Sequence, residues 1–149
     1  MSVLAKNKKA LFDYEILDKT EAGLVLSGAE TKSVKNGNLT LKGTFVTFHN
    51  DEAYLTGAHI SKYGPSGNVD YEPDRSRKLL LKKKQIRYLA GKSQEKGLTI
   101  VPLSVYTKNR FIKVEIAVGR GRHKYDKREV IKKRDTDREV KRILKKIKI

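Results

Sequence analysis

Hydrophobic and polar side chains alternate with a period of two along several stretches of the chain. The clearest stretch places Ile112, Val114, Ile116 and Val118 on one side. The other side holds Phe111, Lys113, Glu115 and Ala117. This alternation is typical of a β-strand with one face buried. We therefore expect a half-buried strand there and at three shorter stretches with the same pattern, which contain Phe12, Tyr14 and Ile16, then Phe45 and Thr47, and then Leu98 and Ile100.

Turn-forming segments separate these strands. They are Glu21-Ala22-Gly23, Asn50-Asp51 and Lys108-Asn109. Glycine, asparagine and aspartate tolerate the left-handed backbone that tight hairpins need. The pattern predicts hairpins at all three places, and hence an antiparallel sheet.

Two segments have helical rather than strand signals. Ser27 followed by Glu30 fits a capping box, and Asn36-Gly37 supplies a left-handed stop, so we expect a helix at about 28 to 36. A second helix fits 81 to 94. Its apolar strip contains Leu81, Gln85, Ile86, Leu89 and Ala90.

The segment from 62 to 77 is rich in glycine, proline and aspartate, which predicts a mobile surface loop. Short strands with one helix inserted before the last two are typical of an oligonucleotide-binding barrel. The predicted fold is therefore mainly β with added helices: an oligonucleotide-binding-like antiparallel β-barrel followed by a basic C-terminal tail.

Charge divides the chain into two parts. Its 149 residues include 34 Lys and Arg against 17 Asp and Glu, a net charge of +17, and residues 120–149 alone hold 14 of the basic residues and five acidic ones. Glycines in Gly119-Arg120-Gly121-Arg122 mark the boundary. We expect a folded body at 1–119 and a tail at 120–149. The tail has only a two-turn apolar stripe, so we expect it to be disordered alone and helical on a partner.

Composition excludes several classes of protein. The chain has no cysteine, which excludes disulfides, cysteine-bound zinc and thiol nucleophiles. No apolar run reaches the roughly 18 residues of a membrane span, and no secretory signal opens the chain. We expect a soluble, cytoplasmic protein that makes no membrane contact.

No group of residues forms a convincing catalytic or metal site. His49, His59 and His123 lack metal-ligand spacing. Asp13 and Glu15 would share a strand face and could hold Mg²⁺, although a solvated outer face explains them more simply. Pro73-Asp74 resembles the start of a metal-nuclease motif, but Lys113-Val114-Glu115 places the later Lys and Glu in the wrong order. We expect no enzyme activity, no cofactor and no metal.

Basic residues interleaved with aromatic or apolar ones favour structured RNA as the partner. Cations neutralise phosphates, and a tyrosine ring can stack on an unpaired base. The alternative is that the lysines form solvated faces and the body aromatics belong to the core. The residues that carry this pattern are Lys8 and Lys9 before Tyr14, Lys78 beside Leu80, and Arg122, Lys124, Lys127 and Arg128 around Tyr125.

Five ordered blocks resemble the bacterial SsrA-binding protein family, SmpB. The resemblance spans roughly residues 7 to 149, and it departs from the family pattern at Thr31 and His123. The blocks are Asn7-Lys8-Lys9-Ala10 with Tyr14, Glu21 to Gly37, Arg77 to Leu81, Lys96 to Leu103, and Tyr125-Asp126-Lys127-Arg128.

The resemblance implies a non-catalytic protein of trans-translation. Such a protein binds the transfer-RNA-like domain of transfer-messenger RNA and delivers it to a 70S ribosome stalled without a stop codon. Its tail is unstructured in the free protein and probes the empty mRNA channel, where it meets small-subunit RNA. Elongation factor Tu would be a further partner, reached through the RNA.

The resemblance also assigns roles to matching residues. Glu21 could accept from a base amino or ribose 2′-OH group or orient a neighbouring lysine; the alternative is a plain turn residue. Asp126 could hold Lys127 or Arg128 or cap a tail helix. The residues expected to lie on the RNA-facing body or to support it are Asn7, Tyr14, Glu21, Lys32, Lys35 and Leu80. Those expected to act at the decoding region are Gly121, Tyr125, Asp126, Lys127 and Arg128.

Two other functions remain open from sequence. One is a ribosomal protein, or another translation factor that binds ribosomal RNA, with the tail as a permanent anchor. The other is an RNA-processing nuclease that would depend on Asp13 or Asp74.

Overall fold

The computed structural model describes residues 2–64 and 70–122 of the chain. The predictions for the tail from residue 123 onward therefore lie outside the described residues. None of the helices in the described ranges is long and apolar enough to span a bilayer. The elements in chain order are β1 (Ser2–Lys6), α1 (Lys8–Asp13), β2 (Tyr14–Leu24), α2 (Gly28–Lys35), β3 (Leu39–Thr40), β4 (Phe45–His49), β5 (Glu52–Thr56), β6 (His59–Ile60), β7 (Arg77–Leu80), α3 (Lys83–Ser93), β8 (Leu98–Lys108) and β9 (Phe111–Gly121).

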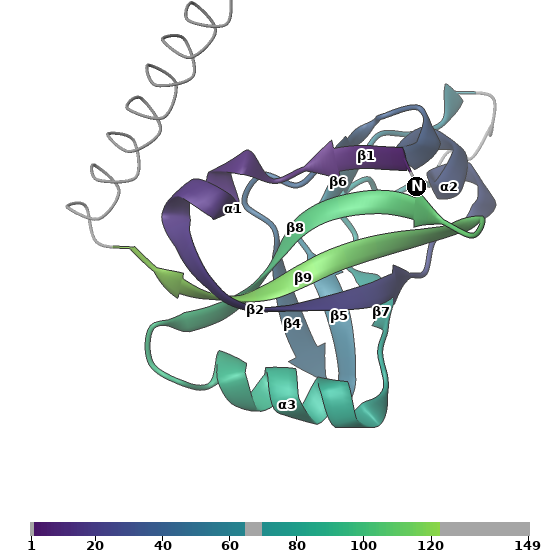
Figure 1. The fold of residues 1–149 in the computed structure, drawn as a ribbon. Coiled ribbons are helices and arrows are strands. Elements are labelled where there is room, and N and C mark those ends of the chain that lie inside the picture. The colour runs from purple at the N-terminus through teal and green to yellow at the C-terminus, as the bar shows by residue number, and fades with distance from the viewer. Residues whose placement is uncertain (1, 65–69, 123–149) are drawn as a thin grey trace, which may run out of the picture.

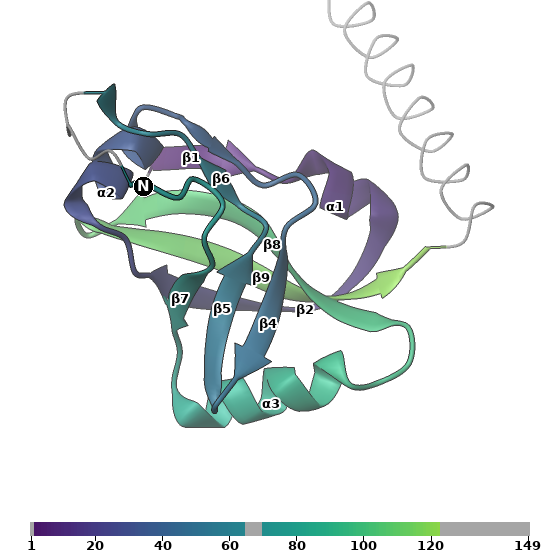
Figure 2. The same cartoon turned by 180° about the vertical axis from the view of Figure 1, so that it is seen from behind.

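One curled antiparallel sheet organises the protein. Its strands follow the order β1-β8-β9-β2-β7-β5-β4, and β3 pairs separately with β6. The sheet curls until β4 comes close to β8. Helix α3 lies across one end, while α1 and α2 lie at the opposite side, far from each other (Figures 1 and 2). The prediction of a mainly antiparallel β fold with added helices is confirmed.

The alternating pattern fills the inside of this sheet. Ile112, Val114, Ile116 and Val118 of β9 are all buried in one core cluster, as predicted. From the helices, Leu89 of α3 joins the same cluster. The long strands thus bury one face, while α3 covers an open end of the sheet.

Both predicted helix signals and one of the predicted hairpins are confirmed. Ser27 Oγ accepts from the Glu30 backbone N–H at 3.2 Å, and Glu30 Oε1 accepts from the Ser27 N–H at 3.1 Å. Gly37 follows α2 with φ 81°. At the β4–β5 hairpin, Asn50 and Asp51 have φ of 51° and 61°. The last hairpin turns one residue later than predicted, at Asn109 and Arg110.

The predicted hairpin at 21 to 23 is wrong, because β2 continues through these residues to Leu24. Gly23 pairs with Leu80 of β7, and a Cβ at Gly23 would lie 3.2 Å from the Leu80 Cβ. A glycine within a strand can mark a close approach of a neighbour rather than a turn. Here the neighbour is the Leu80 side chain.

The strand predicted around Phe12 is also wrong at its start. Phe12 lies in α1, and β2 begins only at Tyr14. Before α1, residues Ser2–Lys6 form β1, which the sequence did not indicate. This strand forms because it pairs with β8, more than ninety residues later in the chain.

The loop predicted at 62 to 77 ends earlier than expected, because Arg77 is fully buried at the start of β7. Its Nε donates to Glu30 Oε2 at 2.8 Å and its Nη1 donates to the Ala58 carbonyl at 2.8 Å. Arg75 also pairs with Glu30. Burial raises the pKa of the Glu30 carboxyl, but hydrogen bonds from Ser27, Arg75 and Arg77 outweigh it and hold that pKa below its ordinary value.

Candidate nucleic-acid interface

Helix α1 presents two lysines at the side of the sheet, and Asn7 fixes this helix. The Asn7 Oδ1 accepts from the Ala10 N–H at 3.1 Å, its Nδ2 donates to the Pro102 carbonyl at 2.9 Å, and its backbone N–H donates to Leu103. Asn7 is only 4% exposed. It therefore supports the surface and does not itself offer a side chain to a partner.

Lys8 and Lys9 occupy the first turn of α1, with no acidic residue in that turn, and both are exposed. Cations are disfavoured at a helix N-terminus, because the unpaired N–H groups carry partial positive charge there. Neither lysine forms an ion pair within the described residues. Local helix stability therefore does not explain these two lysines, whereas an anionic partner would.

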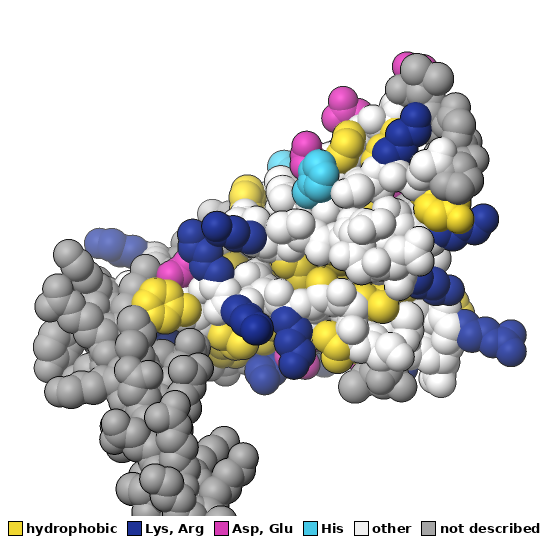
Figure 3. All heavy atoms as spheres, turned by 90° about the horizontal axis from the view of Figure 1, so that it is seen from above, with side chains coloured by type: hydrophobic (Ala, Val, Ile, Leu, Met, Phe, Trp, Pro, Cys, Tyr) yellow, Lys and Arg dark blue, Asp and Glu magenta, His cyan; other side chains and the backbone are white. Residues whose placement is uncertain are grey.

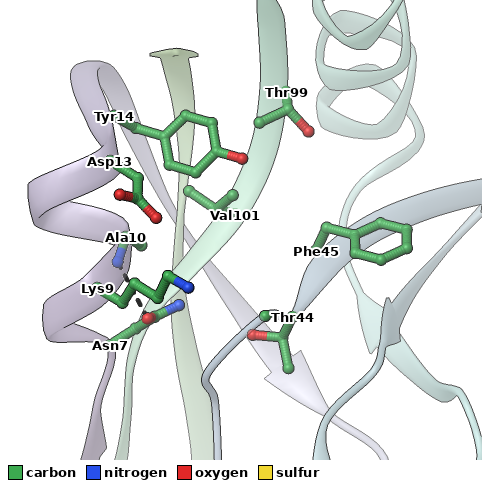
Figure 4. A pocket seen from close by; sticks show the side chains of 10 residues that line it. Asn7, Lys9, Ala10, Asp13, Tyr14, Thr44, Phe45, Thr99 and Val101 are labelled. Atoms are coloured by element: carbon green, nitrogen blue, oxygen red, sulfur yellow. Dashed lines mark hydrogen bonds between the residues drawn. The ribbon is translucent and has the colours of Figure 1, made fainter. Parts of the chain in front are cut away.

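A pocket of about 340 Å³ opens beside α1 (Figure 4). The helix and Tyr14 form one wall, and the segment Gly43 to Phe45 that leads into β4 forms the other. Buried Ala10 and Val101 belong to a small second hydrophobic cluster against which Tyr14 packs, and they give the pocket an apolar floor. Tyr14, predicted to face RNA, thus borders a cavity.

Sequence reasoning missed Thr44 and Phe45 as part of this surface. The alternation around residue 45 suggested that Phe45 points inward, but Val46 is the buried residue and Phe45 is 43% exposed. A one-residue shift in a strand exchanges its two faces. The signal that could have revealed it is the pairing of Val46 with the buried Leu55 of β5.

Basic side chains continue from the pocket over β1 and the neighbouring segment before β4. A second, shallow groove of about 350 Å³ is lined by Lys6, Lys8, Lys9 and Lys42, among others. Seen from above, Lys and Arg side chains are spread over this face with white and yellow surface between them (Figure 3). Such a basic surface suits a phosphate backbone.

On α2, Lys32 and Lys35 are exposed, as an RNA contact requires. The Lys32 Nζ lies 5.5 Å from the centroid of the Tyr63 ring, within the range of a cation–π contact. The helix itself is anchored below by Glu30. Lys32 and Lys35 therefore project from a firmly held element.

Glu21 holds two neighbours on the outer face of β2. The Tyr106 hydroxyl donates to Glu21 Oε2, and the Lys108 Nζ lies 3.5 Å from both carboxylate oxygens. The hydrogen bond from Tyr106 and the charge of Lys108 lower the pKa of Glu21, while burial and this carboxylate raise the pKa of Tyr106. Since β2 continues past Glu21, the turn alternative is wrong, and the contact with Lys108 fits the orienting role.

The two predicted residues of β7 differ in what they offer. Lys78 Nζ donates to Glu52 Oε1 at 2.8 Å, and the Tyr54 hydroxyl donates to the other oxygen of Glu52 at 2.9 Å. The hydrogen bond and charge of Glu52 raise the pKa of Lys78. Leu80 is 57% exposed over Gly23. The charge of Lys78 is thus already balanced inside the protein, whereas Leu80 presents a bare apolar surface.

The last described residues leave the sheet beside α1. Gly121 pairs with Tyr14 in the β2–β9 register, and the Arg122 N–H donates to the Asp13 carbonyl at 2.9 Å. The paired strand thus extends two residues beyond the boundary expected at 119. Lys124, Tyr125, Asp126, Lys127 and Arg128 lie outside the described residues.

Within the described ranges, no group of three or more His, Cys, Asp or Glu residues could hold a metal ion. Asp13 ends α1 while Glu15 lies on β2, so the two do not share a strand face as the Mg²⁺ alternative assumed. In the loop after β6, Asp74 forms an exposed pair with His59 at 2.7 Å. The geometry thus offers cations, exposed aromatic rings and a pocket.

Comparison with known proteins agrees with this surface. The family model described as SmpB protein matches residues 4–146. The SsrA-binding protein of Ligilactobacillus salivarius is 49% identical over 97% of this chain and 93% of its own length, and that of Sulfurihydrogenibium sp. is 51% identical over 99% and 97%.

A solved structure described as "tmRNA-SmpB: a journey to the center of the bacterial ribosome" aligns with a TM-score of 0.69 and 39% identity. The alignment covers 88% of this chain and 95% of that one. The family resemblance noted from the sequence blocks is confirmed. The chain belongs to the SmpB protein family.

Proposed function

We propose that the protein binds the transfer-RNA-like domain of transfer-messenger RNA and delivers it to stalled ribosomes for trans-translation. The observation that carries this proposal is family membership over nearly the whole chain, joined to a solved relative described as a tmRNA-SmpB structure on the bacterial ribosome. The exposed lysines of α1, which form no ion pair within the described residues, give the proposal its physical basis, because they can neutralise phosphates.

The body supplies the specific RNA contacts in this proposal. Lys8, Lys32 and Lys35 meet phosphates, and Lys9 adds its positive charge beside the pocket. Tyr14 and Leu80 offer surfaces for bases or sugars, and Asn7 supports α1 from below. Glu21 orients Lys108 and Tyr106. Lys78 contributes least, because Glu52 already neutralises it.

The tail supplies the ribosome contacts. Gly121 and Arg122, the last described residues, lie beside α1. In this proposal residues 124–128 act at the decoding region, against small-subunit RNA. A helix of the basic tail forms in the empty mRNA channel, where phosphates neutralise its self-repulsion. Elongation factor Tu joins through the RNA and needs no contact with this chain.

In this proposal the protein has no catalytic activity and acts in the cytoplasm. The RNA-binding character of the family supports the first point, and the ribosome as partner supports the second. The alternative, a ribosomal protein with a permanent anchor, differs in what purifies with it. A ribosomal protein should purify with every small subunit. The protein proposed here should purify only with transfer-messenger RNA and with stalled ribosomes.

The test is to sequence the RNA that purifies with the full chain and then to measure affinity for the transfer-RNA-like domain. We expect transfer-messenger RNA to dominate. A double change of Lys32 and Lys35 to Ala should lower the slope of log affinity against log salt by up to about one per lost phosphate contact. Equal recovery of all ribosomal RNA, without enrichment of transfer-messenger RNA, would contradict the proposal.

A matched experiment tests the tail. Changing Lys127 and Arg128 to Ala should leave affinity for the isolated RNA domain nearly unchanged while sharply reducing peptide transfer on stalled ribosomes. A loss of affinity for the isolated domain equal to that of the Lys32 and Lys35 double variant would contradict the division between body and tail.

A further inference from the structure

The pocket beside α1 combines groups that recognise a nucleobase rather than a phosphate. Its volume of about 340 Å³ lies near the lower end of the range for small-molecule sites, about 300–1,000 Å³. Buried Ala10 and Val101 make an apolar floor. A phosphate has no apolar surface to bury against such a floor, whereas the flat ring of a base does.

An aromatic ring forms one border of this pocket. The ring of Tyr14 stands over Asp13 and Val101 at the mouth (Figure 4). Tyr14 packs against the cluster that contains Ala10 and Val101, and Gly119 leaves room for it, because a Cβ at Gly119 would lie only 2.9 Å from the Tyr14 Cβ. An aromatic surface held in this way can stack with an unpaired base without first being ordered.

Two opposite charges of α1 point into the same cavity. The Asp13 carboxylate and the Lys9 ammonium extend from successive turns of the helix toward the space below the Tyr14 ring (Figure 4). A carboxylate accepts from N–H groups, and an ammonium donates to a carbonyl or ring nitrogen. Guanine offers N–H donors at N1 and N2 beside an acceptor at O6, so its edge matches this pair. Cytosine and uracil match it less well, because neither has two adjacent N–H donors next to a carbonyl.

We propose that this pocket takes one unpaired guanine of the bound RNA, stacked on Tyr14, with its Watson–Crick edge toward the Asp13 carboxylate and the Lys9 ammonium. The inference rests on the proposed function, which brings a structured RNA to this face. The adjoining groove with Lys6, Lys8 and Lys42 holds the flanking phosphates. The body then reads one base identity in addition to the shape and charge of the RNA.

Base analogues test the pocket with the full chain and the transfer-RNA-like domain of transfer-messenger RNA. Inosine, which lacks the N2 amino group, replaces each unpaired guanine in turn. At one position we expect inosine to weaken binding by about tenfold. In Asp13→Asn that penalty should shrink, because a neutral amide oxygen accepts from N2 more weakly than the charged carboxylate does. Glu15→Gln is the matched control: it removes the same charge two residues away, outside the pocket, and should keep the penalty.

A second pair of changes guards against a folding defect in Asp13→Asn. 6-Thioguanine keeps the N1–H and the N2 amino group but has sulfur, a weaker acceptor, in place of O6, so at the same position it should weaken binding to the wild type and not to Lys9→Met. Lys9 is exposed, so this variant keeps its fold. Tyr14→Leu should lower affinity roughly five- to 150-fold through lost stacking, whichever purine is present.

The outcomes separate this inference from the proposed function. If the wild type binds the RNA domain selectively but no guanine position shows a penalty that depends on Asp13 or Lys9, the guanine pocket is wrong and the RNA-binding proposal stands. If the wild type binds the domain no better than a transfer RNA of similar size, both are wrong.

Discussion

Charged side chains have different surroundings at the two helices α2 and α1, which flank the barrel-like sheet. On the α2 side, Glu30 is buried and receives hydrogen bonds from Arg75, Arg77 and its own cap residue Ser27. On the α1 side, Lys8 and Lys9 stand exposed, without an ion pair in the described part of the chain. Charges that are paired and buried serve the fold, whereas charges left unpaired at an unfavourable helix end serve a partner.

The difference also explains why charge density alone is a poor guide to an RNA site. Arg77 and Lys78 are adjacent in a basic segment of the sequence. Arg77 is fully buried with Glu30, and Lys78 is paired with Glu52. Arg77 is therefore out of reach of RNA, and Lys78 is a weaker candidate for a phosphate contact than an exposed lysine without an ion pair. The structure therefore moves the expected centre of phosphate binding away from β7 and toward α1.

The largest effect should come from breaking the buried network. Glu30→Ala leaves Arg77 as an uncompensated buried charge, and we expect a loss of about 3–5 kcal/mol in the free energy of unfolding. Urea denaturation of the full chain measures it. Glu52→Ala is the matched control, since its pair with Lys78 is exposed and should contribute no more than about 1 kcal/mol.

A milder variant extends this prediction to RNA. Glu30→Gln keeps an acceptor oxygen for Arg77, and it should leave the salt slope of RNA binding unchanged while it lowers stability. A reduced salt slope in this variant would show that the α2 network acts in RNA binding as well as in the fold.

Acid should remove the stability that the Glu30 carboxylate provides on the α2 side. The pKa of Glu30 is lower in the folded protein than its ordinary value of 4.5, so its stabilising contribution is complete above that value and is lost as pH falls through the folded pKa. Urea midpoints of the wild type and Glu30→Gln, compared from neutral pH down to about pH 3, should converge as the acid protonates Glu30. A constant gap between them would contradict this origin of the stability.

How much of this contrast the sequence could reveal depends on the range of the interactions. The capping box of α2 and the alternation of β9 are local patterns, and both were predicted correctly. The bond from Arg77 to Glu30 joins residues 47 positions apart, and β1 and α1 depend on contacts with β8. Sequence spacing contains no signal for such contacts. The lysines of α1 could be named as candidates from the sequence, and their contact with RNA stays a prediction. The pocket could not be named, because Thr44 and Phe45 come to it from a distant segment of the chain.

A smaller effect on stability should follow from loss of the α1 cap. Asn7→Ala removes the acceptor for the Ala10 N–H and the donor to Pro102, so we expect a loss of about 1–2 kcal/mol in the free energy of unfolding. RNA affinity should fall with it, although Asn7 is buried, because Lys8 and Lys9 lose their fixed positions. Full RNA affinity in a destabilised Asn7→Ala would show that α1 need not be ordered to bind RNA.

The smallest effect on stability, and the sharpest test of the comparison, comes from the lysines themselves. Lys8→Ala and Lys9→Ala should each change the free energy of unfolding by no more than about 0.5 kcal/mol, because neither forms a pair in the described residues. Each should nevertheless lower the salt slope of RNA binding by up to about one. Lys78→Ala removes the same charge. Because Lys78 already pairs with Glu52, we expect this change to lower the salt slope less than the other two. The experiment is a salt titration of RNA affinity for the three variants side by side. Equal slopes for Lys78→Ala and Lys9→Ala would mean that pairing within the protein does not decide which lysines bind RNA.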